Sequence, residues 1–176
     1  MRYRNASAST SKCHSSFASL ACIHPAFITV LDAGGDEHLD LAVANIGASG
    51  SNSNLTLLKG NGSGGFRPPV VLAPGQKTSC VRAADLDLDG LADLAVVGKL
   101  NPNVLVLRGK GDGTFAPVVE FPVEATPYNV AVADLDGDGD LDLAAACQDG
   151  GVDVLRNDTR RATVPDCNAN GIPDSC

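Results

Sequence analysis

The sequence predicts an all-β fold built from about three repeated units of four short strands each. Of the 176 residues, 44% are hydrophobic but only 4% are aromatic, and the chain contains 19 Gly and 10 Pro. This composition favours short strands joined by tight turns around a core of Val, Leu and Ala. A strand-like pattern that recurs about every 50 residues is the second observation, and it indicates a repeat architecture.

The repeat is visible in two landmarks of each unit. The first landmark is an apolar stretch that follows an aspartate: HLDLAVAN at 38–45, LADLAVVG at 91–98 and DLDLAAAC at 140–147. The second is an alternating stretch with a Gly-rich end: LTLLKGNGSGGF at 55–66, VLVLRGKGDGTF at 104–115 and the shorter VDVLRND at 152–158. We therefore expect units at 26–75, 79–124 and 128–158, the third without its last strand, between an N-terminal arm at 1–25 that we expect to be disordered and a tail at 159–176.

The second unit shows the order of elements most clearly. Its expected strands are Cys80–Ala84, Leu94–Val97, Val104–Arg108 and Phe115–Phe121, with an acidic loop at Asp85–Asp93 and a Gly-rich turn at Gly109–Thr114. Four strands in about 50 residues are typical of a β-propeller blade, and propellers close with about 4–8 blades. Three units thus predict a partial β-propeller, an incomplete ring that other blades or a second chain would complete. Phe66 and Phe115, which follow the Gly-rich turns, are expected to pack between blades.

The acidic loops carry the candidate metal ligands. In the third loop, D-L-D-G-D-G-D-L-D, carboxylates stand at positions 1, 3, 5 and 9, a glycine stands at position 6, and a carbonyl is available at position 7. Hard oxygen ligands in this spacing are what Ca²⁺ takes, whereas Mg²⁺ prefers a tighter octahedron with more water. The predicted ligands are Asp134, Asp136, Asp138, Asp142 and the carbonyl of Asp140.

The second loop repeats the pattern and the first departs from it. The second offers Asp85, Asp87, Asp89, Asp93 and the carbonyl of Leu91. The first keeps Asp32, Asp36 and Asp40 but has Gly34 at position 3 and Glu37 at position 6, so we expect a weak calcium site or a relic. The alternative for all three is a set of solvated acidic turns.

An EF-hand is the competing interpretation, because its first six positions agree with these loops. The bidentate Glu of an EF-hand at position 12 is replaced by Val96 and Ala145, and the flanking residues are strand-like rather than helical. A fourth candidate loop lies in the tail, with Asp166, Asn168, Asn170, the carbonyl of Ile172 and Asp174. Its alternative is a turn closed by a disulfide between Cys167 and Cys176.

Charge and cysteine content exclude several classes of function. The formal net charge is −8, and no basic patch of the kind that binds nucleic acid is present. No apolar run is long enough to span a membrane, and a signal peptide is not evident. The six Cys form no C-x-x-C pair, which argues against a zinc ribbon or a thioredoxin-like site.

Three stretches resemble the FG-GAP/VCBS repeat, the blade unit of integrin-α-like β-propellers: AADLDLDGLADLAVV at 83–97, VLVLRGKGDGTFAPVVEF at 104–121 and ADLDGDGDLDLAAA at 133–146. The resemblance implies four-stranded blades with one calcium loop between the first and second strands. Asp85, Asp87, Asp89 and Asp93 fall on the ligand positions of that family, and so do Asp134, Asp136, Asp138 and Asp142. The tail resembles a short calcium motif of the dockerin or thrombospondin type 3 kind.

We therefore expect a secreted or cell-surface module that binds Ca²⁺ and has a structural, adhesion or interaction role toward an unknown protein or glycan. The alternative is a lectin-like propeller or an accessory module of a secreted hydrolase, although aromatic stacking residues are scarce. We do not expect an enzyme: His14, His24 and His38 match no G-x-S-x-G elbow or metal-histidine motif, and the carboxylates stand at calcium spacing.

Overall fold

The computed structural model describes residues 24–47, 53–74, 77–99, 102–148 and 150–159. Within these ranges the chain forms three antiparallel sheets whose strands follow one another in sequence order. The first sheet contains β1 (Pro25–Leu31), β2 (Asp40–Asn45), β3 (Asn54–Leu58) and β4 (Val70–Pro74). The second contains β5 (Thr78–Ala84), β6 (Asp93–Gly98), β7 (Asn103–Leu107) and β8 (Val119–Pro122). The third contains β9 (Pro127–Ala133), β10 (Asp142–Cys147) and β11 (Val152–Leu155).

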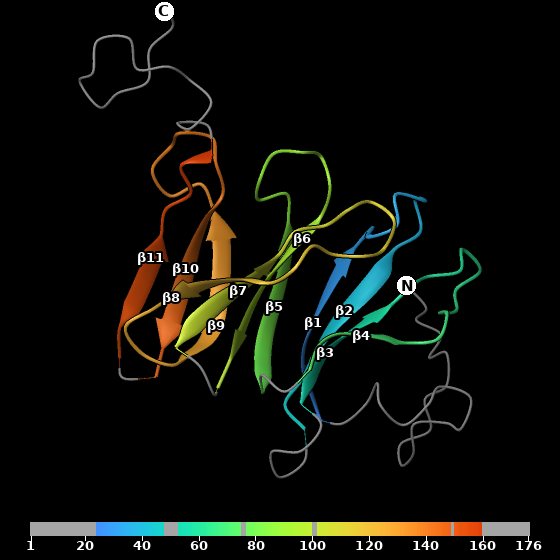
Figure 1. Cartoon of the computed structure of the whole chain (residues 1–176), viewed down its shortest axis with the longest axis horizontal. Helices are drawn as coiled ribbons and strands as arrows, with labels where there is room; N and C mark the ends of the chain where they lie inside the picture. The colour runs from blue at the N-terminus through green and yellow to red at the C-terminus, as the bar shows by residue number, and fades with distance from the viewer. Residues whose placement is uncertain (1–23, 48–52, 75–76, 100–101, 149, 160–176) are drawn as a thin grey trace, which may run out of the picture.

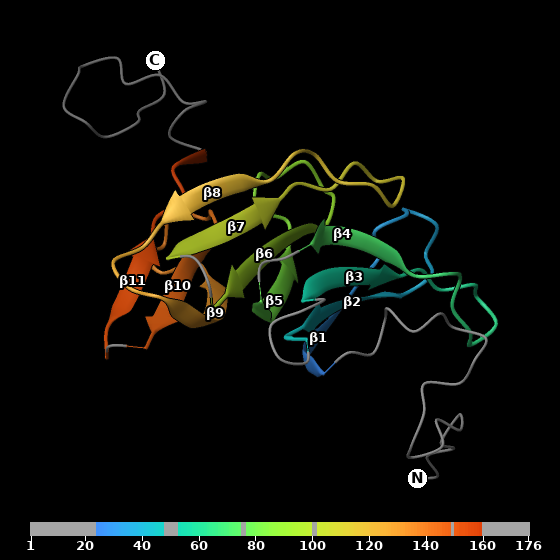
Figure 2. The ribbon, with the colours of Figure 1, turned by 60° about the horizontal axis from the view of Figure 1, so that its bottom comes forward.

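The three sheets stand side by side like blades, with β5 next to β1 on one side and next to β9 on the other (Figures 1 and 2). The connections β1–β2, β5–β6 and β9–β10 all lie at the same edge, uppermost in Figure 1. The sheets do not close into a ring in the described part of the chain, and the third sheet has three strands there. The expected all-β, partial β-propeller is therefore confirmed.

The final strand of the second unit is shorter than predicted. The sequence pattern gave Phe115–Phe121, whereas β8 begins at Val119, and Phe115 makes only an isolated bridge with Gly109. The bridge closes the Gly-rich turn before the chain reaches the sheet edge. Gly60 and Phe66 form the same bridge in the first unit, so the turn geometry repeats.

Two hydrophobic clusters fill the spaces between neighbouring sheets. The cluster between the first and second sheets includes Leu55, Leu57, Leu94 and Val96, all completely buried. The cluster between the second and third sheets includes Val97, Val104, Val130 and Leu143. Side chains of a strand alternate between the two faces of its sheet, so the middle sheet supplies residues to both clusters. Burial of each such aliphatic side chain stabilises the fold by about 1.5–3 kcal/mol.

Phe115 and Phe66 differ in their packing although they occupy the same motif position. Phe115 packs against the cluster between the first and second sheets, as predicted. Phe66 is half-buried and belongs to neither cluster. The reason is geometric: the turn of a unit packs back on the unit before it, and no sheet precedes the first one in the described residues.

Among the described residues, no helix has the length and hydropathy needed to cross a membrane. The N-terminal arm up to residue 23 and the tail from residue 160 lie outside the described residues. Strand β1 begins at Pro25, one residue before the expected start of the first unit.

Candidate metal sites in the acidic loops

The three acidic loops share one backbone conformation. Positions 4 and 6 of each loop have positive φ, the left-handed region that favours glycine. Position 4 is Gly35, Leu88 or Gly137, with φ of 62°, 63° and 81°, and position 6 is Glu37, Gly90 or Gly139, with φ of 62°, 84° and 91°. The loops are therefore curled in the same way whether or not glycine occupies the left-handed positions.

The position-1 carboxylate holds the curl together. Both oxygens of Asp85 accept backbone hydrogen bonds, Oδ1 from the N–H of Asp89 at 3.1 Å and Oδ2 from the N–H of Gly90 at 3.0 Å. Asp134 likewise accepts from the N–H groups of Gly137 at 2.7 Å and Gly139 at 3.0 Å. A curled loop of this kind turns the side chains at positions 1, 3 and 5 toward one another.

The structure brings the carboxylates at positions 1, 3 and 5 together in two loops. One oxygen from each of Asp85, Asp87 and Asp89 lies within 4.8 Å of the others, and the same holds for Asp134, Asp136 and Asp138. Each triplet also contains a buried carboxylate oxygen, Oδ1 of Asp87 or Oδ2 of Asp138, that has no hydrogen-bond partner among the described residues. A buried anionic oxygen without a partner costs about 1–3 kcal/mol or more, so these sites fit a bound cation, which would offset that cost.

The position-9 aspartates lie outside these triplets and connect the loop to the Gly-rich turn. Asp93 accepts the N–H of Leu86 with Oδ2 at 2.9 Å and the N–H of Gly109 with Oδ1 at 2.7 Å. Asp40 and Asp142 make the equivalent pairs of hydrogen bonds. Sequence reasoning missed this bracing role, because the spacing alone indicated only a ligand. Each oxygen keeps a second lone pair, so the predicted ligand role of Asp93 and Asp142 stays a prediction.

The pKa values of two of these bracing carboxylates, Asp93 and Asp142, are shifted in opposite directions. Burial raises the pKa of Asp93, and the nearby carboxylates of Asp87 and Asp89 add to the increase. The backbone N–H of Asn157 instead holds the pKa of Asp142 below its ordinary value. At Asp93 desolvation outweighs the two backbone hydrogen bonds, whereas at Asp142 the backbone hydrogen bonds outweigh desolvation.

The predicted carbonyl ligands follow directly after the triplets. The N–H of Leu91 donates to Oδ1 of Asp89 at 2.8 Å, and the N–H of Asp140 donates to Oδ1 of Asp138 at 2.9 Å. These hydrogen bonds fix the peptide at position 7 relative to the position-5 carboxylate. The role of the two carbonyl oxygens as ligands stays a prediction.

The first loop lacks a triplet of this kind. Glycine at position 3 removes one carboxylate, and Asp36 lies 3.2 Å from Nδ1 of His38 and 3.9 Å from the guanidinium of Arg67. The backbone N–H of His38 lowers the pKa of Asp36. Asp32 accepts the N–H groups of Gly34, Asp36 and Glu37, so its role is to hold the loop. Asp32, Asp36 and Asp40 are therefore not gathered as a metal site.

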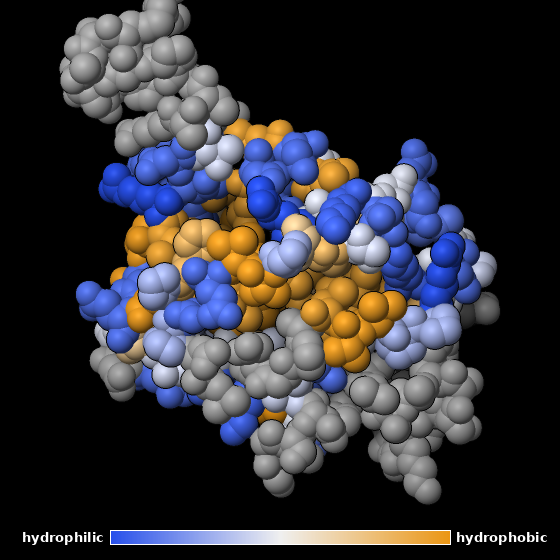
Figure 3. Space-filling model, in the orientation of Figure 1, coloured by the Kyte–Doolittle hydropathy of each residue, from blue (hydrophilic) through white to orange (hydrophobic). Residues whose placement is uncertain are grey.

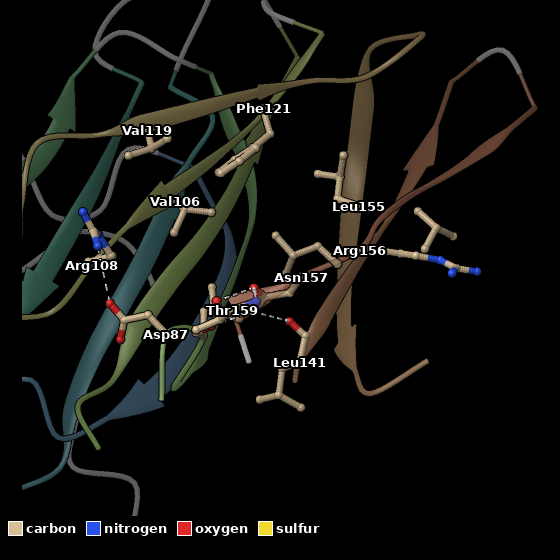
Figure 4. Close-up of a pocket in the computed structure, with 13 residues that line it drawn as sticks. Asp87, Val106, Arg108, Val119, Phe121, Leu141, Leu155, Arg156, Asn157 and Thr159 are labelled. Carbon is tan, nitrogen blue, oxygen red and sulfur yellow. Dashed lines mark hydrogen bonds and ion pairs between the residues drawn. The ribbon is translucent and has the colours of Figure 1, made fainter. Parts of the chain in front are cut away.

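An arginine lies beside the position-3 carboxylate of each complete triplet. Arg108 is 3.7 Å from Oδ2 of Asp87, and Arg156 is 3.7 Å from Oδ2 of Asp136. Figure 4 shows the Arg108–Asp87 pair at one end of a groove of about 520 Å³ between the second and third sheets. Apolar side chains gather where β7, β8 and β11 border this groove (Figure 3). The corresponding space between the first and second sheets holds Phe115, which has no counterpart among the described residues of the third unit.

Neighbouring sheets are joined at the acidic loops. The N–H of Gly113, in the second Gly-rich turn, donates to the carbonyl of Ala33 in the first loop at 2.7 Å. The side chain of Asn157, in the third unit, donates to the carbonyl of Leu86 in the second loop at 2.6 Å. Ala33 and Leu86 both occupy position 2, so the first and second loops are each held at this position by the following unit.

The remaining sequence-based predictions concern the tail and the cysteines. The predicted ligands Asp166, Asn168, Asn170, Ile172 and Asp174 lie outside the described residues, as do Cys167 and Cys176. Among the described residues, Cys80 and Cys147 are buried and unpaired. Burial raises the pKa of the Cys147 thiol, which makes it a poor nucleophile.

The FG-GAP-like repeat family matches the chain twice, at residues 32–96 and 85–145, and the two matches together include all three acidic loops. No curated protein sequence matches the chain significantly. A solved structure of an Agrocybe aegerita lectin, from work on specific recognition of non-reducing terminal N-acetylglucosamine, is similar over 75% of this chain and 35% of that chain, with 20% identity and a TM-score of 0.50.

A second structure, of BBS1N in complex with ARL6DN, is similar over 77% of this chain and 52% of that chain, with 17% identity and a TM-score of 0.46. The chain thus spans about a third of the length of the lectin and about half that of BBS1N. At these identities the similarity concerns the fold alone.

Proposed function

Because the chain belongs to the FG-GAP-like repeat family, we propose that it is a non-enzymatic, calcium-binding module in which Ca²⁺ at two loops fixes the edge of the propeller blades. The observation that carries the proposal is the pair of aspartate triplets, each with a buried carboxylate oxygen that lacks a hydrogen-bond partner among the described residues. Asp85, Asp87 and Asp89 would hold one ion, and Asp134, Asp136 and Asp138 the other. The bound ion would supply positive charge and oxygen coordination, with no chemical step.

The donor set supports Ca²⁺ over other common metals. Every side chain in the two triplets is a carboxylate, which favours hard cations over zinc or copper. Ca²⁺ accepts six to eight oxygens in flexible geometry, and Mg²⁺ demands a tight octahedron. Backbone carbonyls at position 7 and the position-9 carboxylates offer further oxygens close by in the sequence.

Hydrogen bonds within the chain connect the acidic loops to the sheets, so a metal ion that orders a loop would also stabilise the contacts between the blades. Asp93 connects the second loop to its Gly-rich turn, and Asn157 connects that loop to the third unit. When the triplet is not neutralised, repulsion among its carboxylates favours opening of the loop. Opening would also release these contacts, so metal removal is expected to loosen the interface between the sheets.

The proposed setting is extracellular or on the cell surface, with a structural, adhesion or interaction role. Extracellular calcium modules work with dissociation constants of about 10⁻⁴–10⁻³ M, which suits partly exposed loops such as these. The two triplets contain residues that are only partly buried or exposed. Catalysis is not part of the proposal, since the clustered carboxylates are assigned to metal and His38 is paired with Asp36.

A second candidate function is carbohydrate binding. Two observations favour it: the similarity in fold to a lectin, and the groove between the second and third sheets, which combines Phe121 with Arg108, Arg156 and Asn157. A glycan array with the full chain, repeated with Phe121→Ala, tests it. Binding that is lost in the variant supports this candidate, and binding to no glycan argues against it.

Thermal unfolding in Ca²⁺, in Mg²⁺ and in EDTA tests the main proposal. A ligand at 100 times its dissociation constant stabilises the fold by about 2.7 kcal/mol per site, and 1 kcal/mol shifts Tm by about 2–4 °C for a chain of this size. Saturating Ca²⁺ should therefore raise Tm by roughly 5–10 °C per site, and Mg²⁺ by less. Equal melting temperatures in Ca²⁺ and EDTA would refute the proposal.

In the variant Asp87→Ala, the difference in melting temperature from the wild type should have opposite signs in EDTA and in Ca²⁺. In EDTA the variant should melt above the wild type, because it removes one of three crowded carboxylates and the oxygen without a partner. In Ca²⁺ it should melt below the wild type, because a ligand is lost. Glu120→Gln is the control: Glu120 lies outside the loops and contacts Asn103, so its effect should be the same in both buffers.

A further inference from the structure

The two faces of each sheet carry different residues, and the difference repeats from unit to unit. In the second sheet, the rows Val81–Val96–Leu105 and Ala83–Leu94–Leu107 pack against the first sheet. In the third sheet, the rows Val130–Ala145–Asp153 and Val132–Leu143–Leu155 face the second. We call this face, turned toward the preceding unit, the rear face, and the opposite one the forward face.

The forward faces have alanine or valine on their second strand and leucine or valine on their third. The first sheet presents the cross-strand pairs Ala42–Leu57 and Ala44–Leu55, and the second presents Ala95–Val106 and Val97–Val104. These residues are buried in the two clusters between sheets. Each forward face packs on the rear face of the next sheet, and the same pattern of residues on the forward face occurs at both interfaces.

Among the described residues, one forward face and one rear face lack a neighbouring sheet, at the two ends of the row of sheets. The third sheet has the forward pairs Ala144–Val154 and Ala146–Val152, where Val154 is 50% and Val152 is 66% exposed. The first sheet has the rear rows Ile28–Val43–Thr56 and Val30–Leu41–Leu58, where Ile28 is 52% and Val30 is 54% exposed and Val43 and Thr56, on the inner strands, are buried. Each end face has the residue pattern of its counterparts between the sheets, so the two complement one another.

The loops carry the same asymmetry. Position 2 is buried in the first and second loops, at Ala33 and Leu86, because the following unit covers it, but Leu135 in the third loop is 51% exposed. Gly113 contacts Ala33, whereas a Cβ at Gly64, its counterpart in the first unit, would meet nothing within 4 Å. A donor and an acceptor of the repeated contact between units are thus both available at the two ends.

We propose that two copies of this chain associate head to tail, the forward face of each third sheet on the rear face of the other copy's first sheet, to close a six-bladed ring. The three blades of the described residues, taken twice, give six, which lies within the range of about 4–8 blades in which propellers close, and a head-to-tail contact closes when its rotation returns to the start. Leu135 of one copy would accept the N–H of Gly64 from the other, as Ala33 accepts that of Gly113. Phe66, which belongs to neither cluster, would pack as Phe115 does.

The mass of the full chain in solution, measured by sedimentation velocity in Ca²⁺ buffer, tests the proposal. The expected mass is that of two chains across the micromolar range. A single-chain mass throughout that range would overturn the proposal, and so would an open-ended series of larger species, since a head-to-tail contact that does not close forms filaments.

Two double variants locate the contact. Ile28→Glu with Val30→Glu charges the rear face of the first sheet, and Val152→Glu with Val154→Glu charges the forward face of the third. Each should reduce the mass to one chain, because every contact then has one charged side, and circular dichroism should show the folded spectrum. Val118→Glu, at an exposed position of the middle unit, is the control and should keep the two-chain mass.

An equimolar mixture of the two double variants distinguishes head-to-tail from like-to-like pairing. In the mixture one contact has two wild-type faces, so a two-chain species should reappear with weaker affinity. If only one of the double variants becomes a single chain, like faces pair with like and the proposed ring is overturned. If both keep the two-chain mass, the association uses other surfaces and the proposal is equally overturned.

Discussion

Gly113 donates its backbone N–H to the carbonyl oxygen of Ala33 at 2.7 Å, and so joins the Gly-rich turn of the second sheet to the acidic loop of the first. The side chain of Lys59 reinforces the contact by donating to the carbonyl of Asp112 at 2.9 Å. The acidic loops are thus contact points between blades as well as candidate metal sites. A change that orders or loosens the first loop should therefore also affect the interface between the first and second sheets.

Replacement of Gly109 by alanine should destabilise the chain. A Cβ at this position would lie 2.4 Å from the backbone carbonyl oxygen of Ala92, and a backbone atom cannot move aside as a flexible side chain can. The N–H of Gly109 also donates to Asp93, so the strain reaches the brace of the second loop. We expect a loss of about 1–3 kcal/mol in the free energy of unfolding, measured by urea denaturation.

Gly151→Ala is the matched control for Gly109→Ala. A Cβ at Gly151 meets nothing within 4 Å, so this variant should be neutral or slightly more stable than the wild type. Equal effects of the two substitutions would contradict the close approach between the turn and the loop.

Arg108→Met should strengthen calcium binding at the second loop. Arg108 lies 3.7 Å from Asp87 and competes with a metal ion for its charge, while methionine keeps much of the apolar stem. An exposed pair of this kind is worth about 0.2–1 kcal/mol, so we expect roughly a 1.5- to 5-fold lower Kd by isothermal titration calorimetry. Arg67→Met, beside the incomplete first loop, should leave the two Kd values unchanged; a weaker affinity in Arg108→Met would show that the arginine supports the site.

The first loop can be completed by two substitutions. Gly34→Asp supplies the missing position-3 carboxylate, and its Cβ would make only ordinary contacts, 3.5 Å from the nearest atom. Glu37→Gly relieves the positive φ at position 6, at 62°. The double variant should bind one more Ca²⁺ per chain than the wild type in equilibrium dialysis.

The single variant Glu37→Gly distinguishes the effect of backbone strain on stability from the effect of an added ligand on calcium binding. It should raise stability by about 1 kcal/mol, because a left-handed residue other than glycine costs about 1–2 kcal/mol. It should not change the number of bound calcium ions. An unchanged stoichiometry in the double variant would show that the pairing of Asp36 with His38 and Arg67 prevents metal binding.

When metal is removed, the pKa values of Asp93 and Asp142 should differ from the ordinary aspartate value in opposite directions. In EDTA the Asp93 carboxyl has a raised pKa and the Asp142 carboxyl a lowered one. The stabilisation from ionised Asp142 is present above the unfolded-state pKa of about 3.9 and is lost as the pH falls through its lower folded-state pKa. Ionised Asp93 acts oppositely, and its cost in stability grows as the pH rises from about 3.9 through its raised folded-state pKa.

Carboxyl ¹³C NMR titration of the metal-free chain measures both groups. The resonance of Asp93 should move at higher pH than that of Asp142, and the added Ca²⁺ should shift the Asp93 midpoint downward because it favours the carboxylate form. Identical midpoints in EDTA would contradict the opposite directions of the two pKa shifts.

Much of this structure could be predicted from spacing in the sequence. The three units, and the open ring and three-stranded third sheet of the described residues, follow from the recurrence of the apolar and Gly-rich landmarks, since each landmark must occupy the same place in its blade. Glycine at position 6 of the second and third loops agreed with the turn found there, whereas the positive φ at position 4 was not predicted, and Leu88 and Glu37 show that the repeat imposes positive φ even on residues that resist it. Phe115 packs between sheets as its position predicts.

The contacts between units could not be predicted in this way. The bracing hydrogen bonds of Asp93 depend on how the turn at Gly109 returns to the loop, a distance of 16 residues that spacing does not define. Asn157 occupies the place of Gly60 and Gly109, and its side-chain bond to Leu86 crosses 71 residues. Phe66 illustrates the converse, because a motif position fixes packing only where a neighbouring sheet exists.

Calcium stoichiometry tests the central claim most directly. The chain is stripped with EDTA, dialysed and titrated with Ca²⁺ in a calorimeter, beside the variant Asp87→Ala with Asp136→Ala, which removes the position-3 carboxylate from both triplets. The wild type should bind two more ions than this variant, and its melting temperature should rise as they bind. Equal stoichiometry in the two proteins, or no heat in either, would contradict calcium binding at the two triplets.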